Sequence, residues 1–143
     1  MTAREYPARP LVGIGVAVLR EDAVLLVRRG KAPNSGAWSL PGGAQKLGET
    51  AEQAARRELL EETGLTVGEL TLAANVDSIT RDAEGRVQFH YTILDFAARY
   101  AGGAARAGGD STEVAWAPFD GLDAFALWSE ALRVIARARA LLE

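Results

Sequence analysis

The chain has 143 residues, of which 48% are hydrophobic and 24% are charged, and its formal net charge is -3. This length fits one domain, and the composition is that of a globular protein rather than a disordered or fibrous one. The 16 basic residues are scattered along the chain. A nucleic-acid polymer is therefore not an expected partner, because surfaces that bind one cluster their Lys and Arg.

Cysteine is absent, which excludes disulfides, thiolate zinc sites and a cysteine nucleophile. The longest apolar run, Leu11–Leu19, is interrupted by glycines and is far shorter than the roughly 20 residues of a membrane span. Residues 1–10 do not show the basic and then apolar pattern of a secretory signal. We therefore expect a soluble cytoplasmic protein with no membrane partner and a single domain over residues 1–143, in which residues 1–10 form a loose leader.

The first half of the chain predicts strands and then a helix. Short β-branched and aliphatic runs predict strands, and clusters of Gly, Pro, Asn and Ser predict loops. In chain order these are a hairpin of two strands (Leu11–Leu19 and Ala23–Arg28, turning at Glu21-Asp22), a loop (Gly30–Gly36, with Pro33, Asn34 and Ser35), and an extended segment (Trp38–Leu40) that stops at Pro41-Gly42-Gly43.

The segment Thr50–Thr63 predicts a helix with signals at both ends. Thr50 followed by Gln53 fits a capping box, and Gly64 stands where a left-handed glycine ends a helix. The remaining elements are expected to be two strands (Leu70–Ile79 and Val87–Ala98) around a turn at residues 82–85, a Gly- and Ala-rich flexible loop (Tyr100–Gly109), a short strand (Val114–Trp116) and a closing helix (Phe125–Leu142). This order predicts an α+β fold, with a mixed sheet and two main helices on its faces.

The chemistry is concentrated on the first predicted helix. Glu58, Glu61 and Glu62 are spaced i, i+3 and i+4, so they share one helix face. Like charges at this spacing destabilise a helix, and the neighbouring Arg57 supplies a single positive charge, although it could orient Glu61. A divalent cation bound through oxygen would relieve the repulsion; Mg²⁺ is the usual choice beside phosphates, and Mn²⁺ could substitute.

Such a run of acids is usually only a solvated helix face, but here it belongs to a longer pattern. Gly43 is followed after five residues by Glu49, after seven more by Arg57-Glu58-Leu59, and then by Glu61-Glu62 and Gly64-Leu65. These positions would coincide by chance with a probability below about 10⁻⁷ per starting point. Gly42-Gly43 would allow a tight backbone turn that brings a carbonyl close to a metal.

Residues Gly43–Leu65 resemble the signature of the Nudix hydrolases, and the resemblance extends over roughly Leu11–Ile135. It implies an α/β/α sandwich and hydrolysis of a nucleoside diphosphate linked to another moiety. It also implies that Glu58, Glu61 and Glu62 bind the metal together with the Gly42 carbonyl, that Glu49 is an outer ligand, and that Arg57 orients the acids. Arg29 would contact phosphate, although a solvated strand-end charge is the alternative interpretation.

Six further residues are weaker candidates. Family members often add an acid from a loop before the last strand, and here Asp110 and Glu113 are the candidates, against ordinary polar loop residues. His90, the only histidine, is either an ordinary strand residue or a substrate contact. Trp38 could stack on a nucleobase, as could Phe89 and Tyr91, although aromatic residues in strands are more often core.

The expected reaction is attack of water on a phosphorus of the pyrophosphate, with Glu62 or Glu58 as the base and Asp110 or Glu113 as the second choice. The resemblance to an ADP-ribose pyrophosphatase-like group favours a nucleoside diphosphate sugar such as ADP-ribose. Residues 80–83 read Thr-Arg-Asp-Ala where such enzymes carry a proline marker, so hydrolysis of (d)NTPs in nucleotide-pool clean-up remains the alternative. A non-catalytic binding module is a third hypothesis, and a homodimer is possible.

Overall fold

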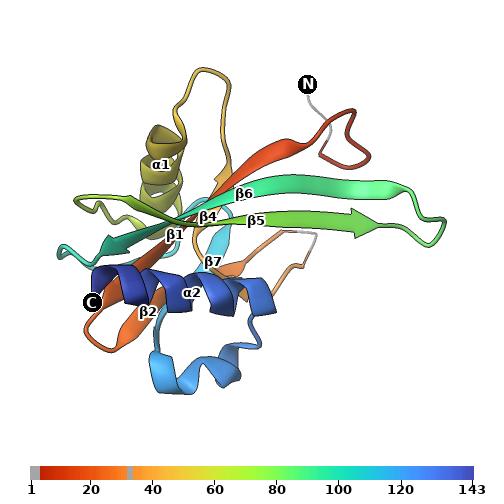
Figure 1. Ribbon diagram of the computed structural model, residues 1–143. Coiled ribbons are helices and arrows are strands. Elements are labelled where there is room, and N and C mark those ends of the chain that lie inside the picture. The colour runs from red at the N-terminus through yellow and green to blue at the C-terminus, as the bar shows by residue number, and fades with distance from the viewer. Residues whose placement is uncertain (1–3, 32–33) are drawn as a thin grey trace.

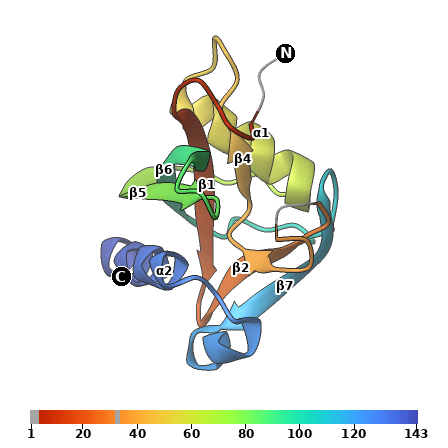
Figure 2. The same ribbon diagram turned by 90° about the vertical axis from the view of Figure 1, so that its right-hand side faces the viewer.

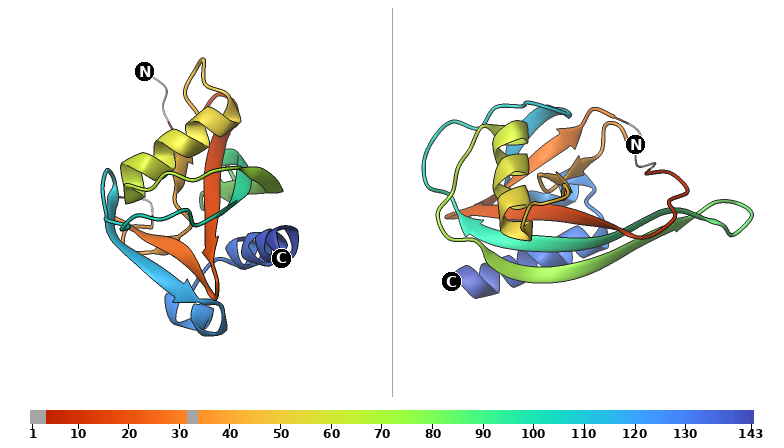
Figure 3. Two further views of the ribbon diagram at one scale, coloured as in Figure 1. Left: turned by 90° about the vertical axis from the view of Figure 1, so that its left-hand side faces the viewer. Right: turned by 90° about the horizontal axis from the view of Figure 1, so that it is seen from above.

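The computed structural model describes residues 4–31 and 34–143, and its elements form three layers (Figure 1). A mixed sheet lies between α1 (Ala51–Thr63) and α2 (Ser129–Leu142), as Figures 2 and 3 show from other sides. The predicted α+β sandwich with two main helices is therefore confirmed. Met1–Ala3 of the predicted leader and Pro33 of the predicted loop lie outside the described residues. No helix within the described ranges is long and apolar enough to span a membrane.

The strands agree with the predicted order, and several of them are longer than predicted. The sheet has seven strands in the described ranges. They are β1 (Leu11–Arg20), β2 (Ala23–Arg29), β3 (Trp38–Ser39), β4 (Gly42–Ala44), β5 (Thr71–Arg81), β6 (Val87–Arg99) and β7 (Ser111–Pro118).

Strand β1 is the centre of the sheet. It pairs in parallel with β6 over Leu11–Leu19, and β5 pairs antiparallel with β6. The predicted hairpin of β1 and β2 is present, but the two strands pair only at Leu19 and Arg20 before they separate. Strand β2 pairs with β7 along its whole length and with β3 near its end, and β4 pairs with β1. Strand β4 is therefore positioned at the middle of the sheet, next to α1.

Each face of the sheet has its own hydrophobic core. On the α1 side, Ala54, Ala55 and Leu59 of the helix pack among residues of β1 and β6. On the α2 side, Ile135 and Ala138 pack against the opposite faces of the same strands. Strand residues alternate between the two faces, so one central strand contributes to both cores.

The closing helix begins later than predicted. Residues Phe119–Phe125 form a short 3₁₀ segment, Ala126 has a left-handed φ of 49°, and α2 begins at Ser129 after Trp128. The predicted start at Phe125 was wrong, because apolar spacing continues through this break while the backbone does not. The apolar side chains of the 3₁₀ segment still pack onto the α2-side core.

The described part of the N-terminal leader is docked rather than loose at Tyr6. Its N–H donates to the Gln88 carbonyl at 2.7 Å, and its hydroxyl donates to Asp82 at 2.8 Å. Gln88 also donates to Glu5 at 2.6 Å. These contacts hold the leader against the far end of the β5–β6 hairpin.

Asp95 of β6 is a buried acid that the sequence analysis did not single out. It is 6% exposed and faces α2, and a Cβ on Gly15 would come within 2.1 Å of its Oδ1. Burial raises the pKa of Asp95 to about 6, and the charge of Arg133 opposes this rise. The absence of a side chain at Gly15 thus leaves room for the carboxyl group of Asp95, which is buried away from water.

The substitution Asp95→Asn should stabilise the protein near neutral pH. The ordinary pKa of 3.8 lies below the folded value of about 6, so the folded state holds the proton more tightly than the unfolded state. The contribution of protonated Asp95 to the free energy of unfolding is therefore fully present below about pH 4. As the pH rises through 6, this contribution is lost and the free energy of unfolding falls by roughly 3 kcal/mol. Urea unfolding between these pH values should show this loss in the parent and a smaller one in the variant. Asp120→Asn, at an exposed position, is the control, and a variant less stable than the parent at neutral pH would contradict the expectation.

Candidate active site

Helix α1 is capped at both ends, as the sequence predicts. The Thr50 hydroxyl accepts from Gln53 N at 3.0 Å, and the Gln53 side chain accepts from Thr50 N at 2.9 Å. At the other end Gly64 has a φ of 74° and donates to the Leu60 carbonyl. Both caps are satisfied, so the helix presents its acids in a fixed frame.

Arg57 is the centre of the acidic cluster. Its Nε and Nη2 donate to the two carboxylate oxygens of Glu49 at 2.6 and 2.9 Å, and Nη1 donates to Glu58 at 2.8 Å. A longer contact of 3.3 Å reaches Glu61, and Nη2 also reaches the Ala44 carbonyl at 3.1 Å. The guanidinium lowers the pKa of Glu49 to about 2, and Glu49 and Glu58 raise the pKa of Arg57. One cation thus serves three carboxylates.

The glycines before the helix serve a different purpose from the predicted one. Gly42 and Gly43 lie in β4, paired with Gly15 and Ile14, so they form extended strand and not a tight turn. A Cβ on Gly43 would lie 2.5 Å from the carboxyl carbon of Glu58, and one on Gly42 would lie 1.9 Å from the Ile14 carbonyl oxygen. Glycine is needed at position 42 because the backbone of β1 lies there, and a side chain at position 43 would displace the Glu58 carboxylate.

Glu62 is held by the same strand. The Gly42 N–H donates to Glu62 Oε1 at 2.7 Å. Burial raises the pKa of Glu62 to about 7, with smaller increases from the charges of Glu58 and Asp110, while the Gly42 N–H and the Arg29 charge oppose the rise. The carboxyl group of Glu62 therefore holds its proton up to a higher pH than an ordinary glutamate does.

The loop before β7 fastens onto the end of α1. Gly108 N donates to the Glu62 carbonyl at 3.1 Å, and the Ser111 hydroxyl donates to the same carbonyl at 2.9 Å. Next to these residues, Asp110 pairs with Lys31 at 3.0 Å, and its carbonyl accepts from Gly30 N. The structure therefore brings Asp110 and Arg29 close to Glu62, as the influence of both charges on the Glu62 pKa also indicates.

Other candidates lie apart from this group. Glu113 pairs with Arg28 at 3.0 Å on β2 and β7. Trp38 packs edge-to-face on Phe125 with ring centroids 5.2 Å apart, among residues of the α2-side core. His90 lies opposite Ile79 in the β5–β6 hairpin, and no described hydrogen bond or ion pair joins it to α1. The geometry gathers Glu49, Arg57, Glu58, Glu61, Glu62, Arg29 and Asp110, and leaves the other three outside.

The acids of α1 fit a divalent cation in chemistry, because carboxylate oxygens are the ligands that Mg²⁺ prefers. In the part of the chain that the structure describes, however, no three acidic or histidine side chains converge as a ready metal site. Glu58 and Glu61 are engaged by Arg57, and Glu62 by Gly42. A cation would therefore compete with Arg57 for the first two carboxylates.

The sequence analysis did not select Lys31, whose ammonium group pairs with Asp110 at the same end of the site. A basic residue two positions after Arg29 was the available signal.

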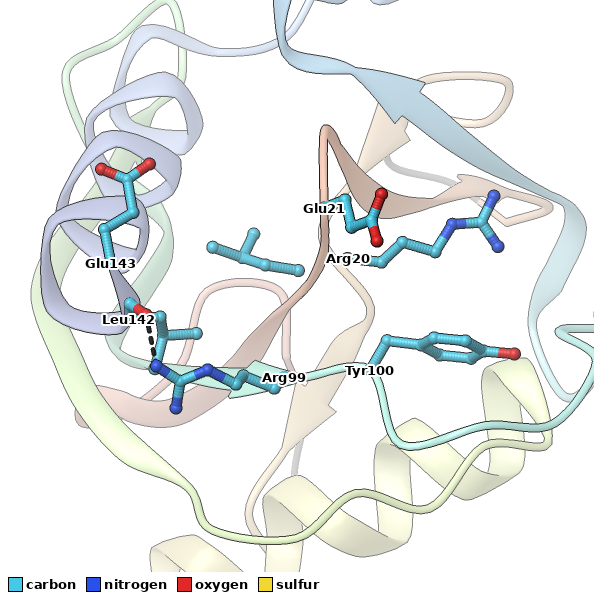
Figure 4. Close-up of a pocket in the computed structure, with 7 residues that line it drawn as sticks. Arg20, Glu21, Arg99, Tyr100, Leu142 and Glu143 are labelled. Atoms are coloured by element: carbon cyan, nitrogen blue, oxygen red, sulfur yellow. Dashed lines mark hydrogen bonds between the residues drawn. The ribbon is translucent and has the colours of Figure 1, made fainter.

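The sequence analysis also did not predict the pocket of Figure 4, which is lined by Leu19, Arg20, Glu21, Arg99, Tyr100, Leu142 and Glu143. None of the candidate residues lines this pocket. Its cations are already engaged, since Arg20 lies over the Trp116 ring at 4.3 Å and Arg99 donates to the Leu142 carbonyl.

The family follows from this fold and site together with similarity to known proteins. The NUDIX domain model matches residues 9–138. A MutT NUDIX hydrolase structure from Burkholderia pseudomallei superposes with a TM-score of 0.79 and 30% identity, covering 90% of this chain and 98% of that one. The chain belongs to the Nudix hydrolase family, so the resemblance noted in the sequence is confirmed.

Two curated relatives have names that give different substrates. An ADP-ribose pyrophosphatase of Methanocaldococcus jannaschii is 36% identical over 104 residues, which are 73% of this chain and 59% of the relative. An oxidized purine nucleoside triphosphate hydrolase of Danio rerio is 48% identical over 61 residues, 43% of this chain and 39% of the relative. The chain thus aligns with less than two thirds of the length of each.

Proposed function

We propose that this chain is a magnesium-dependent pyrophosphohydrolase that cleaves a nucleoside diphosphate linked to another moiety, with ADP-ribose as the favoured substrate. The observation that carries the proposal is the complete acidic face of α1, closely packed on the glycines of β4 and organised by one arginine. A binding module that had lost the chemistry would be expected to lack some of these acids.

Glu58, Glu61 and Glu62 are the residues that would hold Mg²⁺ or Mn²⁺, with the Gly42 carbonyl and Glu49 as further or outer ligands. The bound ion would supply neutralising charge for the phosphate oxygens and would acidify the attacking water. Arg57 keeps Glu58 and Glu49 in place through its hydrogen bonds. Arg29 and Lys31, near the same end of α1, provide positive charge for a phosphate group.

In the reaction a water oxygen forms a bond to one phosphorus, and the bond from that phosphorus to the bridging oxygen breaks. The water loses a proton to a carboxylate, and the leaving phosphate takes the electron pair of the broken bond. Glu62 is the preferred proton acceptor, because its carboxylate is only partly exposed and the Gly42 N–H fixes its position. Glu58 is the alternative on the helix, and Asp110 is the candidate from the loop. Glu113 is less suitable, since it lies within β7 opposite Arg28 rather than in the loop that bonds to the end of α1.

The substrate class rests on the relatives. The name of the M. jannaschii relative favours ADP-ribose, whereas that of the D. rerio relative favours hydrolysis of nucleoside triphosphates, which is the second candidate function. A phosphate-release screen with ADP-ribose, other nucleoside diphosphate sugars, dinucleotides and (d)NTPs tests both. Highest kcat/KM on ADP-ribose supports the first proposal, and highest kcat/KM on a (d)NTP replaces it with the second. If none of these compounds is hydrolysed, the hypothesis of a non-catalytic binding module is the one that remains.

Metal dependence can be measured separately from activity. Calorimetric titration of the folded protein with Mg²⁺ and Mn²⁺ should show uptake, and chelation should abolish hydrolysis. Glu58→Gln should weaken the uptake because it removes a charged ligand, whereas Glu52→Gln, in the first turn of the same helix, should leave it unchanged. If neither ion binds, even with a nucleoside diphosphate present, the metal-ligand assignment is wrong.

A further inference from the structure

The outer edge of β5 is covered over its first half and open over its second. In the described part of the sheet β5 pairs with β6 alone. Arg137 of α2 donates to the Ala73 carbonyl at 2.8 Å, and Arg133 donates to the Asn75 carbonyl at 3.2 Å. These bonds show which residues direct their backbone groups outward, and by alternation the next ones are Asp77, Ile79 and Arg81. Within the described ranges no side chain caps those three.

This open segment belongs to a hairpin that extends beyond the rest of the molecule (Figures 1 and 3). The far end of the hairpin is braced on its β6 side, where Tyr6 bonds to Gln88 and Asp82. The brace leaves the β5 side accessible. An extended, unpaired strand edge of this kind is a template for pairing with another strand.

We propose that this edge pairs antiparallel with the same edge of a second copy of the chain, centred on Ile79. In that register Ile79 lies opposite Ile79 of the partner subunit. Asp77 and Arg81 lie opposite the partner's Arg81 and Asp77, which gives two ion pairs related by a twofold axis. All three side chains point to one face of the strand, and Ile79 is 49% exposed in the single chain. Ser78 and Thr80 face each other on the other side.

Backbone direction, charge pairing and the capped carbonyls favour this register. A shift by one residue would place outward backbone groups opposite inward ones, so the ladder could not form. Centring on Asp77 would oppose two aspartates and would require the carbonyls of Ala73 and Asn75, which the arginines of α2 already occupy. The register centred on Ile79 uses only the uncapped residues.

The charge pattern gives the sharpest test. Asp77→Arg opposes two arginines across the interface and should weaken the dimer at least tenfold, and Arg81→Asp opposes two aspartates with the same result. The double variant Asp77→Arg/Arg81→Asp restores both pairs and should restore the dimer. Sedimentation velocity of the full chain at tens of micromolar measures the association. A monomeric parent, or a double variant no better than the single ones, overturns the proposal.

A second measurement locates the interface without relying on charge. Because the chain contains no cysteine, Ile79→Cys introduces a single thiol on the twofold axis, where opposed Cα atoms lie about 5.5 Å apart. A short bis-maleimide should then link two chains. Leu132→Cys, at a comparably exposed apolar position on α2, is the matched control and should stay unlinked. Linking at Leu132 but not at Ile79 would move the interface to the closing helix and contradict the proposal.

Discussion

Glu58→Gln and Glu62→Gln are each expected to lower turnover of the pyrophosphate substrate by roughly 10² to 10⁴. Glutamine keeps the shape of each side chain but removes the negative charge that a metal ion or a transferred proton requires. Glu58 lies against Gly43 and Arg57, and Glu62 accepts from Gly42, so both amides should be accommodated without unfolding the helix. Steady-state kinetics at saturating magnesium measures the loss.

The control for this experiment is Glu52→Gln, which removes an acid from the exposed first turn of α1, away from β4. It should retain close to full activity. Circular dichroism should show the same helix content for all three variants. If Glu58→Gln and Glu62→Gln both keep near-normal rates with unchanged magnesium dependence, neither carboxylate has the assigned role.

Gly42→Ala is expected to destabilise the fold by about 3 kcal/mol or more, because the added methyl has no space. The new Cβ would lie 1.9 Å from the Ile14 carbonyl oxygen and 2.9 Å from Gly15 Cα, and both are backbone atoms of β1. Only separation of β4 from β1 can relieve this contact. That movement would also carry away the N–H that holds Glu62, so activity should fall with stability. Urea unfolding and kinetics on the same sample measure both effects.

Gly68→Ala is the matched control, since no atom lies within 4 Å of the Cβ that it would gain. Its unfolding midpoint should change little. A Gly42→Ala variant that unfolds at the same urea concentration as the parent would mean that β4 does not lie where the structure has it. That result would also remove the explanation for both glycines.

The acid-bearing helix could be predicted from the sequence because its signals are local. The capping box at Thr50, the end at Gly64 and the spacing of the acids all lie within fifteen residues. The contacts of those acids could not be predicted, because they come from elsewhere. That Gly42 donates to Glu62, and that β4 lies flat against β1, depends on strand pairing between segments far apart in the chain.

Asp110 and Glu113 illustrate the same limit. Both were equal candidates because both precede or enter the last strand, and composition does not separate them. The structure does, since Asp110 lies in the loop that bonds to the end of α1 while Glu113 lies opposite Arg28 on β2. Strand register decided between them, and register depends on the whole sheet.

The predicted start of the closing helix was wrong for a local reason. Phe125 and Leu127 fit the apolar spacing of the helix that follows, and both pack on the α2-side core. Apolar spacing records which side chains are buried and does not record backbone conformation. The left-handed Ala126 between them carries no sequence signal comparable to a glycine.

The contacts between the Tyr100–Gly109 loop and α1 bear on how this segment can vary in length. A connection rich in glycine and alanine ordinarily tolerates insertions. Here Arg106 N donates to the Thr63 carbonyl, and Gly108 N and Ser111 each reach that of Glu62. One extra residue between Arg106 and Ser111 would shift these donors away from their acceptors. The length of the stretch from Arg106 to Ser111 is therefore constrained by its contacts with the end of α1.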